Sequence, residues 1–353
     1  MALEERICEL AGEVAAASSS SAEAARELHS RLLKPQGSLG RLEGLGARLA
    51  AMAKESPPPV PENPAVVICA GDHGVLARGV SPWPTEVTAA MVESFCAGRA
   101  AVNAIARTVG AQVSVLDVGV ASELVRHPLL RAAKVRRGTD DLSVGPAMDR
   151  EGAARAVCAG AGIVEELVES RGVDLLVTGD MGIGNTTPAA CLIAAFTARP
   201  AREVTGRGTG IDDATLERKV RVVEEALALH SSDPGDAIGT LAALGGLEHA
   251  ALVGLILAGA AYGIPVLLDG VVSNSAALVA QTLAPDVVDY TIAGHLSAEP
   301  GARIALEKLG LEPLLDLNMR LGEGTGGLLA VPLVQAAARA LSEMTTRDQA
   351  GVA

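Results

Sequence analysis

The sequence is short of positive charge. Its 353 residues include 29 Lys and Arg against 42 Asp and Glu, which gives a formal net charge of −13. Surfaces that bind nucleic acid or an anionic membrane need clustered cations, so we expect neither kind of partner. An anionic small molecule would have to be held by a few local groups.

Cysteine is sparse, and the motifs of several enzyme classes are missing. The five cysteines form no CxxC pair and have no histidine at metal-ligand spacing, so we predict a reducing compartment, no disulfide and no zinc. There is no P-loop lysine, no dinucleotide-binding glycine triplet, no GxSxG and no HExxH. Kinase, dehydrogenase, serine hydrolase and metalloprotease functions are therefore not favoured.

Targeting signals and membrane spans also find little support. The start, MALEERICEL, has no apolar signal core, which predicts a cytoplasmic protein. Residues 250–268 lack charge and are long enough on paper to cross a bilayer. Three glycines and Pro265 interrupt this run, so we predict a buried helix followed by a strand.

Five apolar runs are typical of buried strands, and helical patterns such as 151–169 and 214–229 lie between them. The runs are 65–70, 113–120, 173–177, 264–269 and a weaker one at 287–292. Strands that alternate with helices predict an α/β fold, with a parallel sheet covered by helices on both faces.

Polar residues follow directly on these runs. Ligands of such sheets bind beyond the carboxyl ends of the strands, so we expect one rim to gather Asp72, His73, Asp117, Asp180, Asp269 and His295. A lone histidine after a strand is more often hydrogen-bonded structure than catalyst, so the roles of the two histidines stay open.

The third run continues into a glycine-rich loop and a helix start, GDMGIGNTTPAA at 179–190. Thr186 or Thr187 is the expected N-cap, and Pro188 lies where a first helical residue is favoured. Free N–H groups at such a turn suit a phosphate or carboxylate. A tight turn without a ligand is the equally weighted alternative.

A second glycine-rich loop, DLNMRLGEGTGG at 316–327, precedes a helix expected at 328–341. Glu323 stands between two glycines and close to Met319 and Leu321, which makes it a candidate base with a raised pKa. An exposed loop glutamate is the alternative interpretation, and the residues alone do not separate the two.

The chain ends are helical in pattern. Residues 1–60 are rich in Ala, Glu and Arg, and Lys34-Pro35 ends one helix while Ser38 is placed to cap the next. A proline-rich linker at 56–61 leads into the first strand.

Several segments together resemble one family, the nicotinate-nucleotide–dimethylbenzimidazole phosphoribosyltransferases. They occur in the family's order along nearly the whole chain: KPQGSLGRLE, AGDHGV, GVSPWPTEVT, VGPAM, GDMGIGNTTPAA, GGLEHAALVG, PVLLDGVVSNSAAL, HLSAEPGARIAL and MRLGEGTGG. Such a set is far more specific than any single glycine loop.

The resemblance implies transfer of phosphoribose from nicotinate mononucleotide to 5,6-dimethylbenzimidazole. The products would be nicotinate and α-ribazole 5′-phosphate, for the lower ligand of cobalamin. The catalytic base would be Glu323. Asp180 stands where some members have Glu, one methylene longer, and is an auxiliary catalytic candidate.

The resemblance also implies two groups of binding residues. The phosphoribosyl group would be received by Gly182, Gly184, Asn185, Thr186, Thr187, Gly208, Lys219 and Ser297. The acceptor base would be lined by Ser81, Pro82, Trp83, Met91, Met319 and Leu321. Met91 stands where relatives can have a polar residue, which leaves the acceptor range open.

For the fold, the resemblance implies a homodimer of Rossmann-like sheets, each with a small helical domain built from both chain termini. The expected units are 1–60 and 311–353 for the small domain and 61–310 for the catalytic domain. No metal and no other cofactor is implied. The alternatives are a paralogue that uses adenine or a phenol, and a protein that binds a mononucleotide without turnover.

Overall fold

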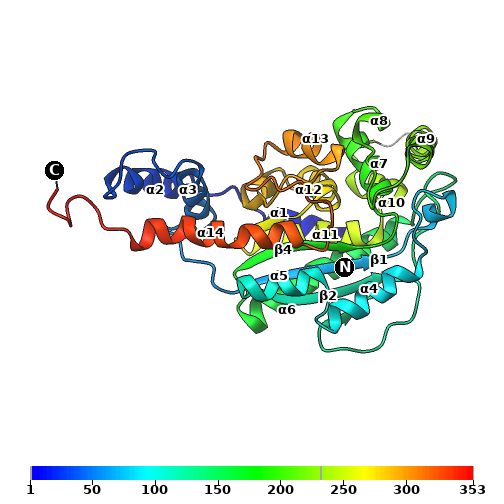
Figure 1. Ribbon diagram of the computed structural model, residues 1–353, viewed down its shortest axis with the longest axis horizontal. Coiled ribbons are helices and arrows are strands. Elements are labelled where there is room, and N and C mark those ends of the chain that lie inside the picture. The colour runs from blue at the N-terminus through cyan, green and yellow to red at the C-terminus, as the bar shows by residue number, and fades with distance from the viewer. Residues whose placement is uncertain (1, 231–232, 353) are drawn as a thin grey trace.

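The computed structural model describes residues 2–230 and 233–352, and within them one parallel sheet organises the fold (Figure 1). Its six strands run in the order β3-β2-β1-β4-β5-β6, and every neighbouring pair is parallel. The strands are β1 (Pro64–Gly71), β2 (Gln112–Gly119), β3 (Leu130–Ala132), β4 (Leu175–Met181), β5 (Val266–Leu268) and β6 (Thr291–Ala293). The predicted α/β class with a parallel sheet is confirmed.

The central strands form because apolar residues dominate them, although β4 also contains Thr178 and Asp180. Every residue of β1 and β4 is buried, as expected for parallel strands covered on both faces. The predicted runs at 65–70, 113–120, 173–177 and 264–269 overlap β1, β2, β4 and β5.

The prediction for the fifth run was wrong over most of its length. Residues Pro285–Tyr290 form a 3-10 helix, η2, and strand β6 begins only at Thr291. Pro285 at the helix start has no N–H to offer to a strand and a backbone angle suited to a helical turn. Strand β3 was not predicted either, because its three residues, partly exposed at the sheet edge, form no apolar run.

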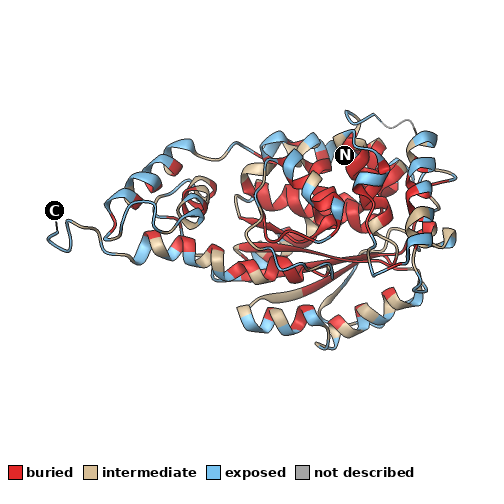
Figure 2. Ribbon diagram, turned by 45° about the horizontal axis from the view of Figure 1, so that its top comes forward, coloured by how far each residue is buried: buried red, intermediate tan, exposed pale blue. Residues whose placement is uncertain are grey.

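Helices cover both faces of the sheet. On one face lie α6 (Arg150–Arg171), α11 (Leu247–Ala261) and α12 (Val271–Leu283), and on the other lie α4 (Glu86–Cys96), α5 (Ala101–Val109) and the start of α14 (Thr325–Glu343). The buried residues concentrate in the sheet and in the helices packed on it (Figure 2).

The long charge-free run forms the predicted helix and strand, α11 and β5, and both are buried. Among the described residues, no helix is both long enough and apolar enough to span a bilayer.

The remaining helices lie mostly beyond the carboxyl ends of the strands or beside α12. They are η1 (Gly74–Arg78), α7 (Thr186–Thr197), α8 (Ala201–Val204), α9 (Asp213–His230), α10 (Ala237–Leu244) and α13 (Pro300–Leu309). The predicted cap of α7 was wrong by one residue. Asn185 is the N-cap and the helix begins at Thr186, because the turn through Gly184 brings the chain into the helix earlier.

A small helical bundle projects from one end of the sheet domain (Figure 1). It consists of α2 (Ser19–Arg31), α3 (Arg41–Ala53) and the second half of α14, packed around Ala25, Ala47, Ala50 and Leu341. Helix α3 has Gly40 as its N-cap, not the predicted Ser38, since the 35–40 turn ends in a left-handed glycine.

The two chain termini do not divide as cleanly as the expected units. Helix α1 (Leu3–Glu13) packs on α6 and α11 instead of joining the bundle. Helix α14 starts on the sheet and runs out into the bundle, so it connects both parts of the molecule. The described residues of these terminal units, 2–60 and 311–352, therefore contribute to both parts of the molecule.

Candidate functional site

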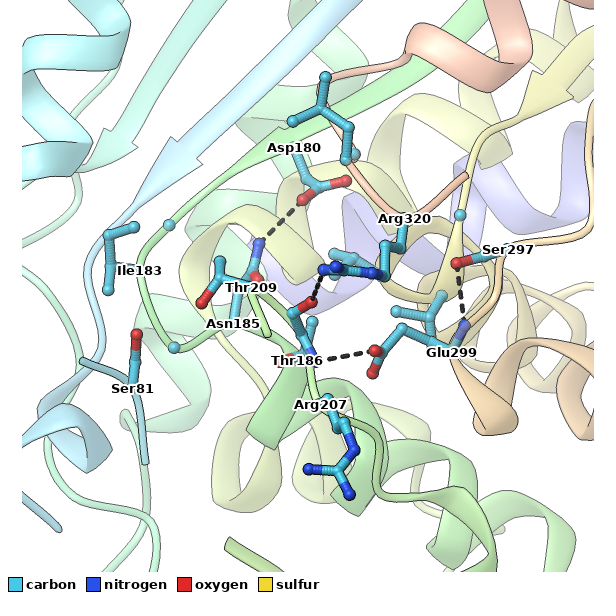
Figure 3. Close-up of a pocket in the computed structure, with 18 of the residues that line it drawn as sticks. Ser81, Asp180, Ile183, Asn185, Thr186, Arg207, Thr209, Ser297, Glu299 and Arg320 are labelled. Atoms are coloured by element: carbon cyan, nitrogen blue, oxygen red, sulfur yellow. Dashed lines mark hydrogen bonds between the residues drawn. The ribbon is translucent and has the colours of Figure 1, made fainter. Parts of the chain in front are cut away.

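A pocket lies beyond the carboxyl ends of β4, β5 and β6. Its walls come from the glycine-rich loop after β4, the 207–211 segment, the start of α12, the loop after β6 and the 320–322 segment (Figure 3). This is the place where an open parallel sheet binds ligands.

The loop after β4 is held in shape by close backbone contacts. A Cβ on Gly182 would lie 2.2 Å from the carbonyl oxygen of Gly71, and Gly184 has φ +90°. Neither position accepts a larger residue without displacing the loop. The first turn of α7 consequently faces the pocket through Asn185 and Thr186, with the positive end of the helix dipole behind them.

Lys219 supplies a buried cation beside this loop. Its side chain reaches from α9, with only 2% of its surface exposed, and Nζ donates to Thr186 Oγ1 (2.7 Å) and to the Gly206 carbonyl (3.1 Å). Burial lowers the pKa of Lys219 to about 8, although Glu299 opposes the shift. A phosphate in the pocket would supply a second anion close to this ammonium.

Two arginines stand at the same wall (Figure 3). Arg320 Nη1 donates to the carbonyl of Gly208 (2.7 Å), and Arg207 Nη1 donates to that of Ile211 (2.8 Å). Glu299 accepts from the N–H of Gly208 (2.7 Å), and Ser297 Oγ accepts from the N–H of Glu299 (3.3 Å). The pocket thus gathers three cations beside the acidic side chains of Asp180 and Glu299, and Arg207 is also paired with Asp213.

Glu323 is buried, with 5% of its surface exposed, which excludes the exposed-loop alternative. It has φ +64° between Gly322 (φ +82°) and Gly324 (φ +85°), so three successive residues adopt the left-handed region. Burial raises the pKa of Glu323 to about 7, with a smaller contribution from Asp269, while a backbone hydrogen bond from Val102 opposes both. Such a carboxylate can accept a proton near neutral pH.

Asp180 lies at the end of β4 and lines the pocket. Its Oδ2 accepts from Asn185 Nδ2 (2.8 Å) and lies 3.2 Å from where a Cβ on Gly322 would be. Burial, followed by the charge of Asp269, raises the pKa of Asp180 well above its usual range. The end of β4, with Asp180, therefore adjoins the loop that carries Glu323.

The structure brings together only some of the predicted binding residues. Those that line the pocket are Asp180, Gly182, Gly184, Asn185, Thr186, Gly208, Lys219, Ser297, Ser81 and Leu321. Those that do not line it are Thr187, Pro82, Trp83, Met91, Met319 and Glu323. Thr187 is fully buried, whereas half of the Trp83 surface (51%) and of the Leu321 surface (55%) is exposed.

Sequence reasoning missed Arg207, Thr209, Glu299 and Arg320, all of which line the pocket. Their motifs did carry a signal. Arg207 and Thr209 flank Gly208, Glu299 follows Ser297 by two residues, and Arg320 belongs to the same MRLGEG segment as Glu323. Polar neighbours of a predicted ligand residue in a loop are candidates themselves.

The rim residues are all buried, and two histidines among them have charged partners. His73 Nε2 lies 2.6 Å from Glu248 Oε1, and His249 Nδ1 lies 2.9 Å from the same oxygen. Burial would raise the pKa of Glu248, but the two histidines lower it to about 2. His295 Nε2 lies 3.5 Å from Asp269 Oδ1.

Within the described residues, His73, Glu248 and His249 are the group that could by type hold a metal ion. The contacts of 2.6 and 2.9 Å are shorter than the roughly 3.3 Å that separates neighbouring ligands of a tetrahedral zinc. The arrangement therefore fits a buried ion pair better than a metal centre.

Comparisons with known proteins show what the chain is similar to. Residues 14–352 match a family model described as phosphoribosyltransferase. A protein of Salinispora tropica, named nicotinate-nucleotide–dimethylbenzimidazole phosphoribosyltransferase, is 55% identical over 93% of this chain and 94% of its own length. A protein of the same name from Chloroflexus aggregans is 53% identical over 94% of this chain and 93% of its own.

Solved structures are similar over the same extent. A crystal structure of CobT from Thermus thermophilus superposes with a TM-score of 0.91 at 47% identity, covering 95% of this chain and 99% of that one.

Proposed function

The chain belongs to the nicotinate-nucleotide–dimethylbenzimidazole phosphoribosyltransferase family, and from that premise we propose how it performs the reaction. It transfers the phosphoribosyl group of nicotinate mononucleotide to 5,6-dimethylbenzimidazole. The products are nicotinate and α-ribazole 5′-phosphate, the nucleotide unit of the cobalamin lower ligand.

The single observation that carries the mechanism is the burial of Glu323, which raises its pKa to about 7. One ring nitrogen of the acceptor attacks the anomeric carbon with its lone pair. The bond from that carbon to the pyridinium nitrogen breaks, and its electron pair returns to the ring, so nicotinate leaves. The proton on the other acceptor nitrogen passes to the Glu323 carboxylate.

The phosphoribosyl group occupies the pocket at the start of α7. Lys219, Arg207 and Arg320 offset the phosphate charge, and Asn185 and Thr186 present the helix N-terminus to it. Asp180 lies between this pocket and the Glu323 loop, which suits a contact with the ribose or with the acceptor.

The acceptor approaches the anomeric carbon from the face opposite nicotinate, so the configuration inverts from β to α. Holding the acceptor and the leaving nicotinate on opposite sides of the anomeric carbon supplies much of the increase in reaction rate. Ser81, Pro82, Trp83, Met91, Met319 and Leu321 form the acceptor side in this proposal. No metal or redox cofactor is assigned, because the departing pyridinium already carries the positive charge that makes it a good leaving group.

We place the enzyme in the cytoplasm as a homodimer, on the family resemblance. A methyl group contributes only about 1 to 3 kcal/mol to discrimination in an apolar slot, so small changes in the slot can change the preferred acceptor. A paralogue that prefers adenine or a phenol would keep the same donor pocket.

A chromatographic assay tests the proposal. The purified protein is incubated with nicotinate mononucleotide and, in parallel, with dimethylbenzimidazole, benzimidazole, adenine and a phenol. We expect nicotinate release that depends on dimethylbenzimidazole and yields an α-linked product. Measurable nucleotide binding without release for any base would instead favour a binding protein.

A further inference from the structure

Asp269 is a buried carboxylate that the reaction scheme does not use. It follows β5 directly, and its side chain is fully enclosed. Oδ1 accepts hydrogen bonds from the N–H groups of Gly326 (2.7 Å) and Gly327 (3.0 Å), and Oδ2 accepts one from the N–H of Gly324 (3.1 Å). Three backbone donors of the Glu323 loop therefore converge on a single side chain.

These donors belong to the start of α14, which has no cap of its own. Its N-cap is Gly324, which has no side chain to accept a hydrogen bond from the first turn. The first N–H groups of a helix need acceptors, and a negative charge there is favoured by the helix dipole. Asp269 provides both from a different element, more than fifty residues earlier in the chain.

The surroundings leave Asp269 and α14 little room to move. The N–H of Asp269 donates to Thr178 Oγ1 on β4 (3.0 Å). Next to it, a Cβ on Gly326 would lie 2.0 Å from the His295 ring, and one on Gly327 would lie 2.6 Å from Val177 Cγ1. The two glycines let the helix start approach the strand ends closely enough to reach the carboxylate.

The conformation of Glu323 depends on this attachment. A non-glycine residue in the left-handed region is disfavoured, by roughly 1 kcal/mol or more, and persists only where its neighbours hold it. Gly324, the residue after Glu323, is the one bonded to Asp269 Oδ2. We propose that Asp269 is the positioning residue that fixes the Glu323 carboxylate for proton transfer, an inference that rests on the proposed function.

The charge of Asp269 adds a second effect. The titratable groups that face the Glu323 loop are Asp269 after β5, Asp180 on β4 and His295 after β6, while α5 offers the Val102 N–H. Asp269 raises the pKa of Glu323 beyond what burial does. Removing this charge should move the acidic limb of the pH–rate profile to lower pH.

The test is a double-mutant cycle of Asp269→Asn and Glu323→Gln, in which kcat for nicotinate release is measured with both substrates saturating. If Asp269 acts through Glu323, Asp269→Asn alone lowers kcat by about 10-fold or more, but by less than about 2-fold when Glu323 is already Gln. Nicotinate mononucleotide affinity, from calorimetry, should stay within about threefold, which also shows that the variant is folded.

Asp149→Asn is the matched control. Asp149 caps α6 by accepting from the N–H of Gly152 (2.7 Å), and it is exposed and outside the pocket. It should change neither kcat nor its pH dependence. If Asp269→Asn yields no folded protein, Asp269→Ser, which keeps one acceptor oxygen and loses the charge, enters the same cycle.

Independent effects of the two substitutions on kcat, multiplying across the cycle, would overturn the inference, as would an unchanged pH profile in the single variant. The failure of the proposed function looks different, since the unmodified enzyme itself would then release no nicotinate with dimethylbenzimidazole.

Discussion

The donor side and the acceptor side of the site are built differently. The phosphoribosyl pocket is lined by the loop after β4, where a Cβ on Gly182 would lie 2.2 Å from the Gly71 carbonyl oxygen, and its cation Lys219 is buried. On the acceptor side, Trp83 and Leu321 are half exposed, and four of the six predicted lining residues lie outside the pocket. Only Glu323, among the acceptor-side groups, is buried and fixed.

This difference indicates that the donor pocket is formed before the substrates bind, whereas the acceptor side is completed only when the acceptor covers it. The donor carries the charge, and a preformed cationic pocket avoids the cost of reorganising loops around it. The acceptor is flat and apolar, so exposed side chains that it covers on binding can recognise it. We expect substitutions on the two sides to separate into changes in nucleotide affinity and changes in turnover or acceptor choice.

The largest expected effect comes from the acceptor side. Glu323→Gln removes the base, and we expect turnover to fall by at least about 100-fold. The loss should persist across the pH range around neutrality, since Gln has no proton to lose. Any pH dependence of turnover that remains in this variant reports the ionisation of the acceptor. Turnover close to that of the unmodified enzyme would show that Glu323 is not the base.

Lys219→Met should act on the donor side. It fills the buried space but removes a charge beside the phosphate, and hydrogen bonds to charged groups contribute about 1.5 to 3 kcal/mol. We therefore expect nucleotide affinity, measured by calorimetry, to fall by about 10-fold to 100-fold. Lys308→Met, at an exposed lysine of α13, serves as the control. Equal affinities in the two variants would mean that the phosphate lies elsewhere.

The buried base should also reduce stability at high pH. The pKa of Glu323 is about 7 in the folded protein against 4.5 for a free side chain, so the folded state holds this proton more tightly. Its contribution to stability is present below pH 4.5 and lost as the pH rises through 7. Glu323→Gln should thus raise the free energy of unfolding at about pH 8 by about 1 to 3 kcal/mol, and hardly at about pH 4.5.

Urea denaturation at the two pH values measures this difference, with exposed Glu27→Gln as the control. A gain of the same size at both pH values would point to a cause other than the ionisation of Glu323.

The smallest expected effect is at Trp83. Its indole is half exposed, so Trp83→Ala should hardly change stability, while KM for the acceptor rises by about 3-fold to 10-fold. KM for nicotinate mononucleotide should not change. A rise in both KM values would contradict the division of the site into a donor side and an acceptor side.

Local sequence signals were enough to predict the sheet and the glycine loop. β1 is an uninterrupted apolar run and β4 begins as one, and the predicted rim residues Asp72, His73 and Asp180 lie at their carboxyl ends. The sequence signals did not predict the elements whose structure is determined by contacts between residues far apart in the chain. β3 has no apolar run, η2 replaces the expected strand, and the cap of α14 comes from Asp269, a residue far away in the chain.

The site was predictable in type more than in detail. The motif around Glu323 indicated a base, but the sequence did not distinguish an exposed glutamate from a buried one, because burial depends on how α14 lies on the strand ends. Thr187 was expected beside Thr186, yet successive helical residues point to different sides, and only Thr186 lines the pocket.

The separation of donor binding from base chemistry is tested most directly by titrating nicotinate mononucleotide into Glu323→Gln in a calorimeter. We predict a Kd within about threefold of the unmodified enzyme, although turnover is lost. A Kd that weakens in proportion to turnover would contradict the account, since Glu323 would then belong to the nucleotide pocket instead of the acceptor side.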